Sequence, residues 1–410
     1  MDTTIKSITA REILDSRGTP TLEVEVFAGN TSAAFSVPGG ASKGSHEPVD
    51  KRDGDRKYLE GMGVTLAIKN VHDVINAALV GHDAKDQKGI DNILLELDGT
   101  ENKSNLGGNT MIGVSIACAK AAAAAQGVEV FEHLRTLENI KPSRKVPYLF
   151  MNLVNGGKHA KTSLAFQEYH IVPQVENVRD ALNIATKVQS DLRVMLIKEF
   201  GVTSANFGDE GGFVPDVVSV TRPVEMLYEV LQKNNFTDKV KLSMDVAASS
   251  FYEGGAYVIG DKKYTTEDMM SMYKEMIAKF PVFSIEDPFH EEDFEAFKKL
   301  REEAVIYVVG DDLTVTNKKR LAMAIETKSI NSIIIKPNQI GTLTETLETM
   351  KLARDNGIEC IVSHRSGDTN DDFISDLAWA FGTFGLKAGA AQRGERVAKY
   401  NRLWQIQELK

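Results

Sequence analysis

The 410-residue sequence has few cysteines and no long apolar segment. Its two cysteines, Cys118 and Cys360, stand in apolar surroundings, which excludes a disulfide framework and a metal–thiolate site. We expect both to be inert core thiols of a reducing compartment. No apolar run approaches the length that spans a bilayer, and the opening MDTTIKSITAREIL has no basic segment followed by an apolar one. These absences predict a cytoplasmic protein without membrane insertion.

The sequence also lacks an excess of positive charge. It has 48 Lys and Arg against 58 Asp and Glu, for a formal net charge of −10. A nucleic-acid binder needs a basic surface, so we expect no nucleic-acid partner. With 42% hydrophobic and 26% charged residues the composition is typical of a globular protein. Its length exceeds one ordinary domain and suits a large α/β barrel with a smaller partner.

Residues 1–137 are predicted to form an α+β domain. TLEVEVFA at 21–28 alternates apolar and polar residues like a half-solvated antiparallel strand, and the preceding ITAREIL is its expected partner. A third strand, at 31–38, leads into the loop GGASKGSHEP. Helical periodicity follows at 64–80, 88–97 and 108–126.

Residues 138–410 are predicted to form a (β/α)₈ barrel. The polar stretch ENIKPSRKVP at 138–147 is the expected domain boundary. Eight strand candidates follow: YLFMNLV, FQEYHIV, VKLSMDVA, VFSIED, IYVVGDD, SIIIKP, ECIVSH and GLKAG. Alternating strands and helices predict a parallel sheet, and eight strands predict its closure into a barrel. Because residues 174–235 read as largely helical, we expect the first units to be irregular.

Polar residues end most of these strands. In chain order they are Asp245, Glu286, Asp311, Lys336, the run His364-Arg365-Ser366, and Lys387. After the first interval, successive positions lie 25, 25, 28 and 23 residues apart, which is about one strand–helix unit each. Such spacing places these residues at the same end of successive strands. In a barrel that end is the face where active sites form.

The three carboxylates of this set predict a metal site. Taken alone, Asp245 could simply cap the next helix. Together, Asp245, Glu286 and Asp311 would repel one another at one barrel mouth unless a cation lay between them. Oxygen ligands without cysteine favour Mg²⁺.

The basic residues of the set predict an anionic ligand. Lys336 and Lys387 each end an apolar strand whose tip faces the carboxylates, although either could be a surface lysine. Arg365 and Ser366, in SHRSG, suit a phosphate or carboxylate. Taken alone, Arg365 could equally pair with a structural acid.

Two further clusters lie in the irregular half of the barrel. FQEYH places Gln167 and Glu168 at the expected end of the second strand, and GDEGG places Glu210 in a glycine-rich loop. His159 occupies a similar loop, NGGKHA. Any one of these could be a turn residue rather than part of a site.

Taken together, these stretches resemble the enolase family along nearly the whole chain. The resemblance rests on ILDSRGTPTLEVEV, GASKGSHEP, NGGKHA, QEY, GDEGG, SMDVA, SIEDPF, GDDLTVTN, KPNQIGT, SHRSGDT and ERVAKYNRL. It implies reversible, Mg²⁺-dependent dehydration of 2-phospho-D-glycerate to phosphoenolpyruvate, in glycolysis and gluconeogenesis. It further implies a homodimer or larger homo-oligomer.

The resemblance also implies roles for single residues. Asp245, Glu286 and Asp311 would hold the tighter of two Mg²⁺ ions, and Ser42 would join the second, which binds with substrate. Lys336 would be the base, and Glu210 the acid with Glu168 beside it. The expected substrate contacts are His159, Gln167, His364, Arg365, Ser366 and Lys387.

Two electrostatic expectations follow from these roles. Mg²⁺ and Lys387 should lower the pKa of Lys336, and the proximity of Glu168 and Glu210 should raise the pKa of one of the two. Lys43 departs from the Thr or Ser usual in its loop, and Gly394 stands where Ser is common.

Two alternative functions remain open at this point. One is a racemase or cycloisomerase of the same superfamily, acting on another carboxylate. The other is a surface or scaffold role in which the terminal Lys410 engages plasminogen.

Overall fold

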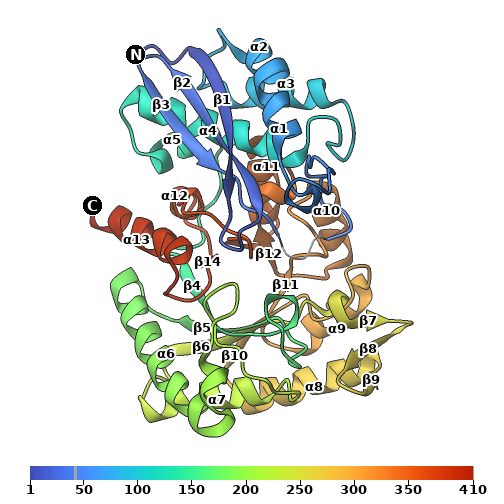
Figure 1. The fold of residues 1–410 in the computed structure, drawn as a ribbon. Coiled ribbons are helices and arrows are strands. Elements are labelled where there is room, and N and C mark those ends of the chain that lie inside the picture. Colours follow the sequence, from blue (N-terminus) through green and yellow to red (C-terminus); the bar gives the residue numbers. More distant parts are fainter. Residues whose placement is uncertain (41–43, 410) are drawn as a thin grey trace.

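The structure, a computed structural model, describes residues 1–40 and 44–409. The predicted metal ligand Ser42, with Lys43 and Lys410, lies outside the described residues. An antiparallel sheet with helices forms one part of the molecule, and a closed eight-stranded barrel forms the other (Figure 1). The predicted fold class is confirmed.

The N-terminal domain is built on a three-stranded meander. Its strands are β1 (Ile5–Leu14), β2 (Pro20–Ala28) and β3 (Thr31–Ser36). β2 pairs antiparallel with both neighbours, as the alternating pattern predicted. The apolar set of β2, with Leu22, Val24 and Val26, is fully buried beneath the helices.

The helices of this domain follow the three predicted segments, and one further helix, the last, was not predicted. They are α1 (Thr65–Asn70), a π-helical turn (Val71–Ile75), α2 (Asn76–Leu79), α3 (Gln87–Asp98), α4 (Gly108–Gln126) and α5 (Val130–Leu137). α4 packs closely on the sheet: a Cβ added at Gly113 would lie only 2.8 Å from the Val24 side chain, so any larger residue at this position would force a shift. Within the described ranges no single helix is long and apolar enough to cross a membrane; α4 and α5 meet that test only as a pair bent by 112°.

Eight strands close the barrel. They are β4 (Tyr148–Asn155), β5 (Glu168–Pro173), β6 (Val240–Asp245), β10 (Val282–Glu286), β11 (Tyr307–Gly310), β12 (Ser332–Ile335), β13 (Glu359–Ser363) and β14 (Gly385–Lys387). The order around the barrel is β10-β11-β12-β13-β14-β4-β5-β6. All eight predicted strands are present.

The prediction of a wholly parallel sheet is wrong for one strand. β5 runs antiparallel to both β4 and β6. The chain between β4 and β5 contains only a 3₁₀ turn, Gly157–His159, and a parallel connection needs a longer crossover, usually a helix. The strand therefore returns in the opposite direction.

This reversal also changes where Glu168 lies along its strand. Glu168 is the first residue of β5, not the last, and it pairs with Asp245 at the end of β6. Gln167 directly precedes the strand. Both residues reach the predicted mouth because β5 begins there.

The barrel helices surround these strands. They are α6 (Val178–Phe200), α7 (Arg222–Lys233), α8 (Thr266–Lys279), α9 (Phe294–Glu303), α10 (Lys318–Thr327), α11 (Leu343–Asp355), α12 (Phe373–Ala380) and α13 (Gly394–Glu408). α6 and α7 occupy the region expected to be helical. A small hairpin sheet follows β6, with strands β7 (Tyr252–Glu253), β8 (Ala256–Ile259) and β9 (Lys262–Tyr264).

The barrel interior is a packed core. Phe150, Val309, Ile334, Ile361 and Phe384 form one buried cluster, separate from the main core between strands and helices. In β12 the side chains alternate, since Ile333 and Ile335 belong to the main core.

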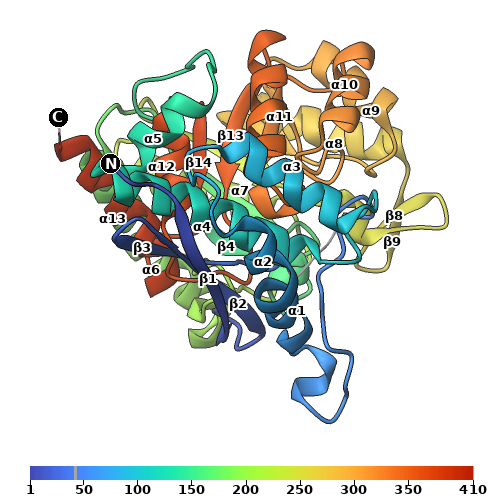
Figure 2. The ribbon, with the colours of Figure 1, turned by 90° about the horizontal axis from the view of Figure 1, so that it is seen from above.

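In the view from above, the N-terminal domain overlies part of the barrel (Figure 2), and its contacts place it at the mouth. Gly39, just after β3, forms an antiparallel bridge with Gly367, just after the SHRSG run. α4 also contacts the 3₁₀ turn Pro337–Gln339, which follows β12. The segment after β3 is therefore brought to the strand ends of the barrel.

Candidate active site

A small pocket opens at the C-terminal ends of the parallel strands. Most of the predicted site residues line it: His159, Gln167, Glu168, Glu210, Asp311, Lys336, His364, Arg365, Ser366 and Lys387. Asp245 and Glu286 lie directly behind it, in contact with Lys387. The structure thus brings together every predicted site residue within the described ranges.

Lys387 lies at the centre of the acidic residues. Its Nζ is 3.0 Å from Asp245 Oδ2, 2.9 Å from both Glu286 carboxylate oxygens and 3.2 Å from Glu168 Oε1. Burial favours the neutral amine, but these carboxylates outweigh it and hold the pKa of Lys387 well above its usual value. Lys387 is therefore a fixed positive charge.

The pKa values of the carboxylates around Lys387 shift in different directions. Burial by itself raises the pKa of Asp245, but the Lys387 ammonium outweighs it and leaves that pKa at about 2. Burial and the charge of Asp245 raise the pKa of Glu286 well above its usual value. The two neighbours therefore differ in how readily they carry a negative charge.

Lys336 projects from the end of β12 toward Asp311. Its ammonium donates a hydrogen bond to Asp311 Oδ2, while Gln339 Nε2 lies 3.0 Å from Asp311 Oδ1. Burial lowers the pKa of Lys336, but the Asp311 carboxylate outweighs it and the pKa lies above its ordinary value. Lys387 lowers this pKa as expected, but the net shift is upward because the Asp311 carboxylate has the larger effect.

Asp311 is held in place by a carboxylate from the preceding strand end. Asp287 Oδ1 accepts the backbone N–H of Asp311 at 3.0 Å, and its Oδ2 accepts that of Asp312 at 2.7 Å. Asp287 has a left-handed backbone, with φ of 42°. It therefore fixes the turn that presents Asp311, instead of facing the pocket.

Glu168 lies among two histidines and a lysine. His170 Nε2 is 2.8 Å from Glu168 Oε2, and His159 Nδ1 is 3.5 Å from Glu168 Oε1. Burial and the charge of Glu210 raise the pKa of Glu168 well above its usual value. Burial also lowers the pKa of His170 to about 3, so this imidazole is neutral.

Glu210 has a set of donors that stabilise its charged form. Asn152 Nδ2 donates to its Oε2 at 3.0 Å, and His364 Nε2 lies 3.2 Å from its Oε1. Arg396 Nη1 donates to His364 Nδ1 at 2.6 Å, which leaves the imidazole proton on Nε2, facing Glu210. Burial would raise the pKa of Glu210, but the histidines outweigh it and hold the pKa well below the usual value.

The expected rise in pKa therefore occurs at Glu168 and not at Glu210. His159 Nδ1 is 3.5 Å from the Oε1 atoms of both residues. The pKa of Glu210 is lowered chiefly by His364, whose Nε2 lies 3.2 Å from Glu210, and also by His159 and Arg396.

Arg365 forms a planar ion pair at the opposite wall of the pocket. Its Nη1 and Nη2 donate to the two oxygens of Glu47 at 3.0 and 3.2 Å. Nη1 also lies 3.4 Å from Asn338 Oδ1. The adjacent Ser366 is buried, and its carbonyl accepts from Arg396 Nη2 at 2.6 Å.

Comparison with known proteins identifies the family. The sequence model described as "Enolase, N-terminal domain" matches residues 5–134, and "Enolase, C-terminal TIM barrel domain" matches residues 143–409. An enolase of Methanocaldococcus jannaschii is 43% identical over 406 residues, covering 98% of this chain and 95% of the relative. An enolase of Methanopyrus kandleri is 44% identical over 412 residues, with the same coverage. The chain belongs to the enolase family.

Its enzymatic function is that of an enolase, a hydro-lyase. Enolases use Mg²⁺, and the donors present here fit that ion. Asp245, Glu286 and Asp311 offer only hard carboxylate oxygens, and the buried Oε1 of Gln167 beside them has no hydrogen-bond partner. Ammonium groups now contact all three carboxylates, so cationic charge is already favoured there.

Several residues of this enolase site were not assigned a role from the sequence. They are Glu47, Asn152, His170, Asp287, Gln339 and Arg396. Asn152 is the one polar side chain well inside the otherwise apolar run YLFMNLV, and this position was a sequence signal for a role in the site. Arg396 lies in a helix far along the chain from its partners, and its spacing carries no such signal.

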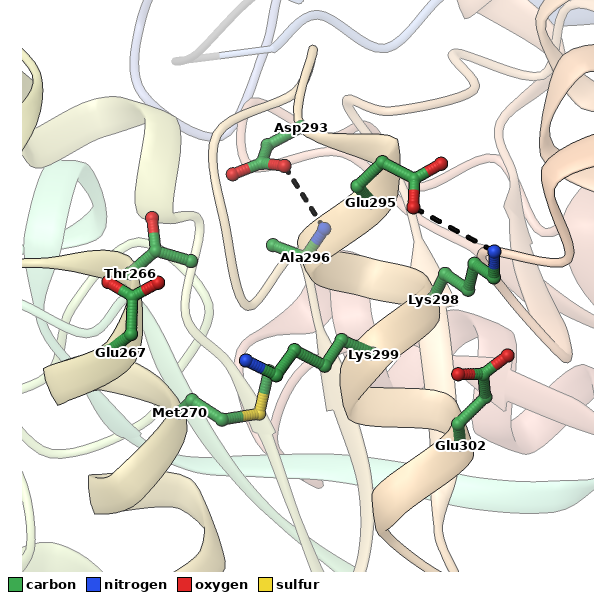
Figure 3. Close-up of a pocket in the computed structure, with 9 residues that line it drawn as sticks. All are labelled: Thr266, Glu267, Met270, Asp293, Glu295, Ala296, Lys298, Lys299 and Glu302. Carbon is green, nitrogen blue, oxygen red and sulfur yellow. Dashed lines mark hydrogen bonds and ion pairs between the residues drawn. The ribbon is translucent and has the colours of Figure 1, made fainter.

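A second pocket lies on the outer surface of the barrel, between α8 and α9 (Figure 3). Asp293 there caps α9 through the N–H of Ala296, and Glu295 lies 3.8 Å from Lys298. The charged side chains that line it are exposed or half-buried. Unlike the barrel mouth, this pocket has solvated charges, and we assign it no role in the enolase reaction.

Proposed function

We propose that the pocket at the barrel mouth catalyses the reversible dehydration of 2-phospho-D-glycerate to phosphoenolpyruvate. One observation carries the proposal. A lysine, Lys336, and a buried carboxyl pair, Glu168 and Glu210, line one pocket together with the arginine Arg365. That set provides a base, an acid and an anion-binding group for a substrate with a carboxylate, a phosphate and a hydroxyl.

Asp245, Glu286 and Asp311 are the proposed ligands of the tighter Mg²⁺, and Ser42 is the proposed ligand of the second. When bound, Mg²⁺ supplies the positive charge that stabilises extra negative charge on the substrate carboxylate, as is already known for the enolase superfamily. The all-oxygen donor set supports this assignment.

Lys336 is the proposed base that removes the proton from C2. It needs a neutral amine, whereas Asp311 favours the ammonium. The positive charges of Arg365 and Lys387 oppose that influence and lower the pKa of Lys336. Engagement of Asp311 as a metal ligand would remove its main ion-pair partner and leave the amine freer to accept a proton.

The Glu168–Glu210 pair is the proposed acid that assists departure of the C3 hydroxyl. Glu210 keeps the direct role that the family resemblance implies, and Glu168 lies beside it. The raised pKa of Glu168 supports a proton stored on that carboxyl. Glu168→Gln should therefore reduce kcat as strongly as Glu210→Gln, and a much weaker effect of the former would assign the role to Glu210 alone.

The remaining contacts concern the phosphate and the walls of the pocket. We propose that Arg365 and Ser366 hold the phosphate, since guanidinium groups suit planar contacts with such anions. Lys387 with Gln167 contacts the substrate, and His159 and His364 line the pocket.

The decisive experiment is the Mg²⁺-dependent appearance of phosphoenolpyruvate absorbance from 2-phosphoglycerate. Wild type and Lys336→Ala should be compared after Mg²⁺ binding has been measured for each by calorimetry. We expect the variant to bind Mg²⁺ and to lose nearly all turnover. Near-normal turnover of the variant with Mg²⁺ bound would overturn the assignment of Lys336 as the base. Absence of turnover by wild type would overturn the proposal that 2-phosphoglycerate is the substrate and would favour another reaction of the superfamily.

Four broader expectations are also proposals. A cytoplasmic location and a homodimer are supported by membership of the enolase family. A domain boundary at 137/138 is supported by family matches that end at 134 and resume at 143. A plasminogen-binding role would be an addition to catalysis, and its predicted residue Lys410 lies outside the described residues.

A further inference from the structure

Glu47 belongs to the N-terminal domain, yet its carboxylate lies in the barrel pocket. Its side chain is 6% exposed, and that of Arg365 is 4% exposed. The carboxylate receives both terminal nitrogens of the Arg365 guanidinium, at 3.0 and 3.2 Å. A two-point contact of this kind fixes the plane of the guanidinium as well as its position.

Glu47 also connects Arg365 with the metal-ligand side of the pocket. Gln339 Nε2 lies 3.4 Å from Glu47 Oε1 and 3.0 Å from Asp311 Oδ1. The backbone N–H of Gly44 donates to Glu47 Oε1 at 3.1 Å. The Glu47 carboxylate thus contacts Arg365 directly, and it contacts Gln339, whose amide also reaches the proposed metal ligand Asp311.

The chain just before Glu47 is held from the opposite side. Ser45 Oγ donates to Glu291 Oε1 at 3.1 Å, and His46 Nε2 is 2.8 Å from Glu292 Oε1. Arg320 Nη1 lies 2.8 Å from His46 Nε2. Because barrel groups hold these residues, the position of the Glu47 carboxylate is set by the scaffold.

We infer that Glu47 is a positioning residue that orients the Arg365 guanidinium and shares it with the phosphate of the substrate. This inference rests on the proposed phosphate-binding role of Arg365. The carboxylate has two opposite effects on the phosphate. It aims the arginine, and as a buried negative charge it also repels the anion that the arginine binds.

Glu47→Gln separates the two effects, because glutamine keeps the size and removes the charge. Without that charge, more of the positive charge of Arg365 is left to the phosphate, and binding should not weaken. The guanidinium loses its two-point support, however, and a misplaced substrate reacts slowly. We expect kcat to fall by about tenfold to a hundredfold, with KM for 2-phosphoglycerate equal to or below that of wild type.

A binding measurement provides a second readout. With Mg²⁺ present, inorganic phosphate should raise the melting temperature of Glu47→Gln more than that of wild type. The matched control is Glu359→Gln, which breaks a partly buried pair, Glu359 with Arg354 at 2.6 Å, at the other end of the barrel. This control should lower the melting temperature, keep kcat within about twofold and show the wild-type response to phosphate.

The outcomes separate the two proposals. Unchanged kcat in Glu47→Gln, or a raised KM with a phosphate response no greater than that of wild type, would overturn the role of Glu47. If phosphate does not stabilise wild type and Arg365→Met leaves KM unchanged, the phosphate-binding role of Arg365 fails first. Should Glu47→Gln not fold, Glu47→Asp keeps the charge but shortens its reach, and a wild-type kcat there would overturn the inference.

Discussion

Replacing Lys387 by methionine tests whether its ammonium and a metal ion stabilise the same carboxylates. Methionine keeps most of the length and apolar volume of the side chain but removes the charge. The ammonium lies within 3.2 Å of three different carboxylates, those of Asp245, Glu286 and Glu168. The variant therefore leaves three buried acids without their shared cation.

The size of the effect follows from these distances. A pair of unit charges 3.0 Å apart attracts with about 5 kcal/mol at an effective dielectric constant of about 20. Much of this attraction offsets the cost of burying the charges, and removal of one partner of a buried pair costs about 3–5 kcal/mol. For 410 residues the entropy of unfolding is about 0.9 kcal/mol/K, so in Mg²⁺-free buffer we expect the melting temperature to fall by about 3–6 °C.

Mg²⁺ should recover much of this loss. An ion present at one hundred times its Kd stabilises the folded chain by about 2.7 kcal/mol. In wild type the ion must compete with the Lys387 ammonium for Asp245 and Glu286, whereas in the variant it does not. The Mg²⁺-dependent rise in melting temperature should therefore be larger in Lys387→Met than in wild type, although the variant should lack turnover.

Lys103→Met is the matched control for this experiment. Lys103 is also buried, with its side chain 6% exposed, but it pairs with a carboxylate that is not one of those around Lys387, Glu345 at 3.1 Å. We expect its loss of stability to be smaller and its response to Mg²⁺ to equal that of wild type. The reasoning is refuted if Mg²⁺ stabilises Lys387→Met no more than wild type, or if the metal-free melting temperature does not fall.

Three further predictions follow from other parts of the structure. Asp287→Ala should weaken Mg²⁺ binding and reduce kcat at least about tenfold, because the backbone N–H groups of Asp311 and Asp312 lose their side-chain acceptor; calorimetry and steady-state kinetics would measure both, and a wild-type Mg²⁺ affinity would contradict it. Both cysteines are fully buried and burial raises the pKa of Cys360 to about 12, so neither should react with a thiol reagent at pH 8 until urea unfolds the chain; rapid labelling of the native protein would show that a thiol is accessible. Phe384→Ala should cost about 3–5 kcal/mol in the free energy of unfolding, since the ring stacks in the cluster that fills the barrel, with little change in kcat/KM; a selective loss of kcat/KM at unchanged stability would speak against a purely structural role.

The spacing of the strand ends predicted the residues at the barrel mouth because parallel strand–helix units have a nearly constant length. Asp311, Lys336 and Lys387 follow this rule and lie in one pocket or directly against it. Glu168 reached the same mouth for a reason that spacing could not supply. The direction of its strand depends on the short connection from β4. The residue pattern of a buried strand does not show whether the strand runs parallel or antiparallel to its neighbours.

The partners of the site residues were harder to predict than the residues themselves. Glu47 and Arg365 are 318 positions apart and meet only because the N-terminal domain lies over the mouth. The same limit applies to the pKa values. Proximity predicted that the pKa of one carboxyl of the Glu168–Glu210 pair would rise, but which of the two rises depends chiefly on His364, which lies against Glu210.

The charges at the mouth explain why a strand as apolar as Ser332–Ile335 ends in a lysine. Five carboxylates, those of Glu168, Glu210, Asp245, Glu286 and Asp311, lie around the ammonium groups of two lysines. The two ammonium groups cannot offset all five, and burial with mutual repulsion raises the pKa of both Glu168 and Glu286. A divalent cation among the proposed ligands would favour the charged form of Glu286 and leave the proton on Glu168, which is not one of the proposed ligands. The same cation would separate Asp311 from Lys336, so the excess of carboxylates that would attract the metal would also prepare the proposed acid and the proposed base.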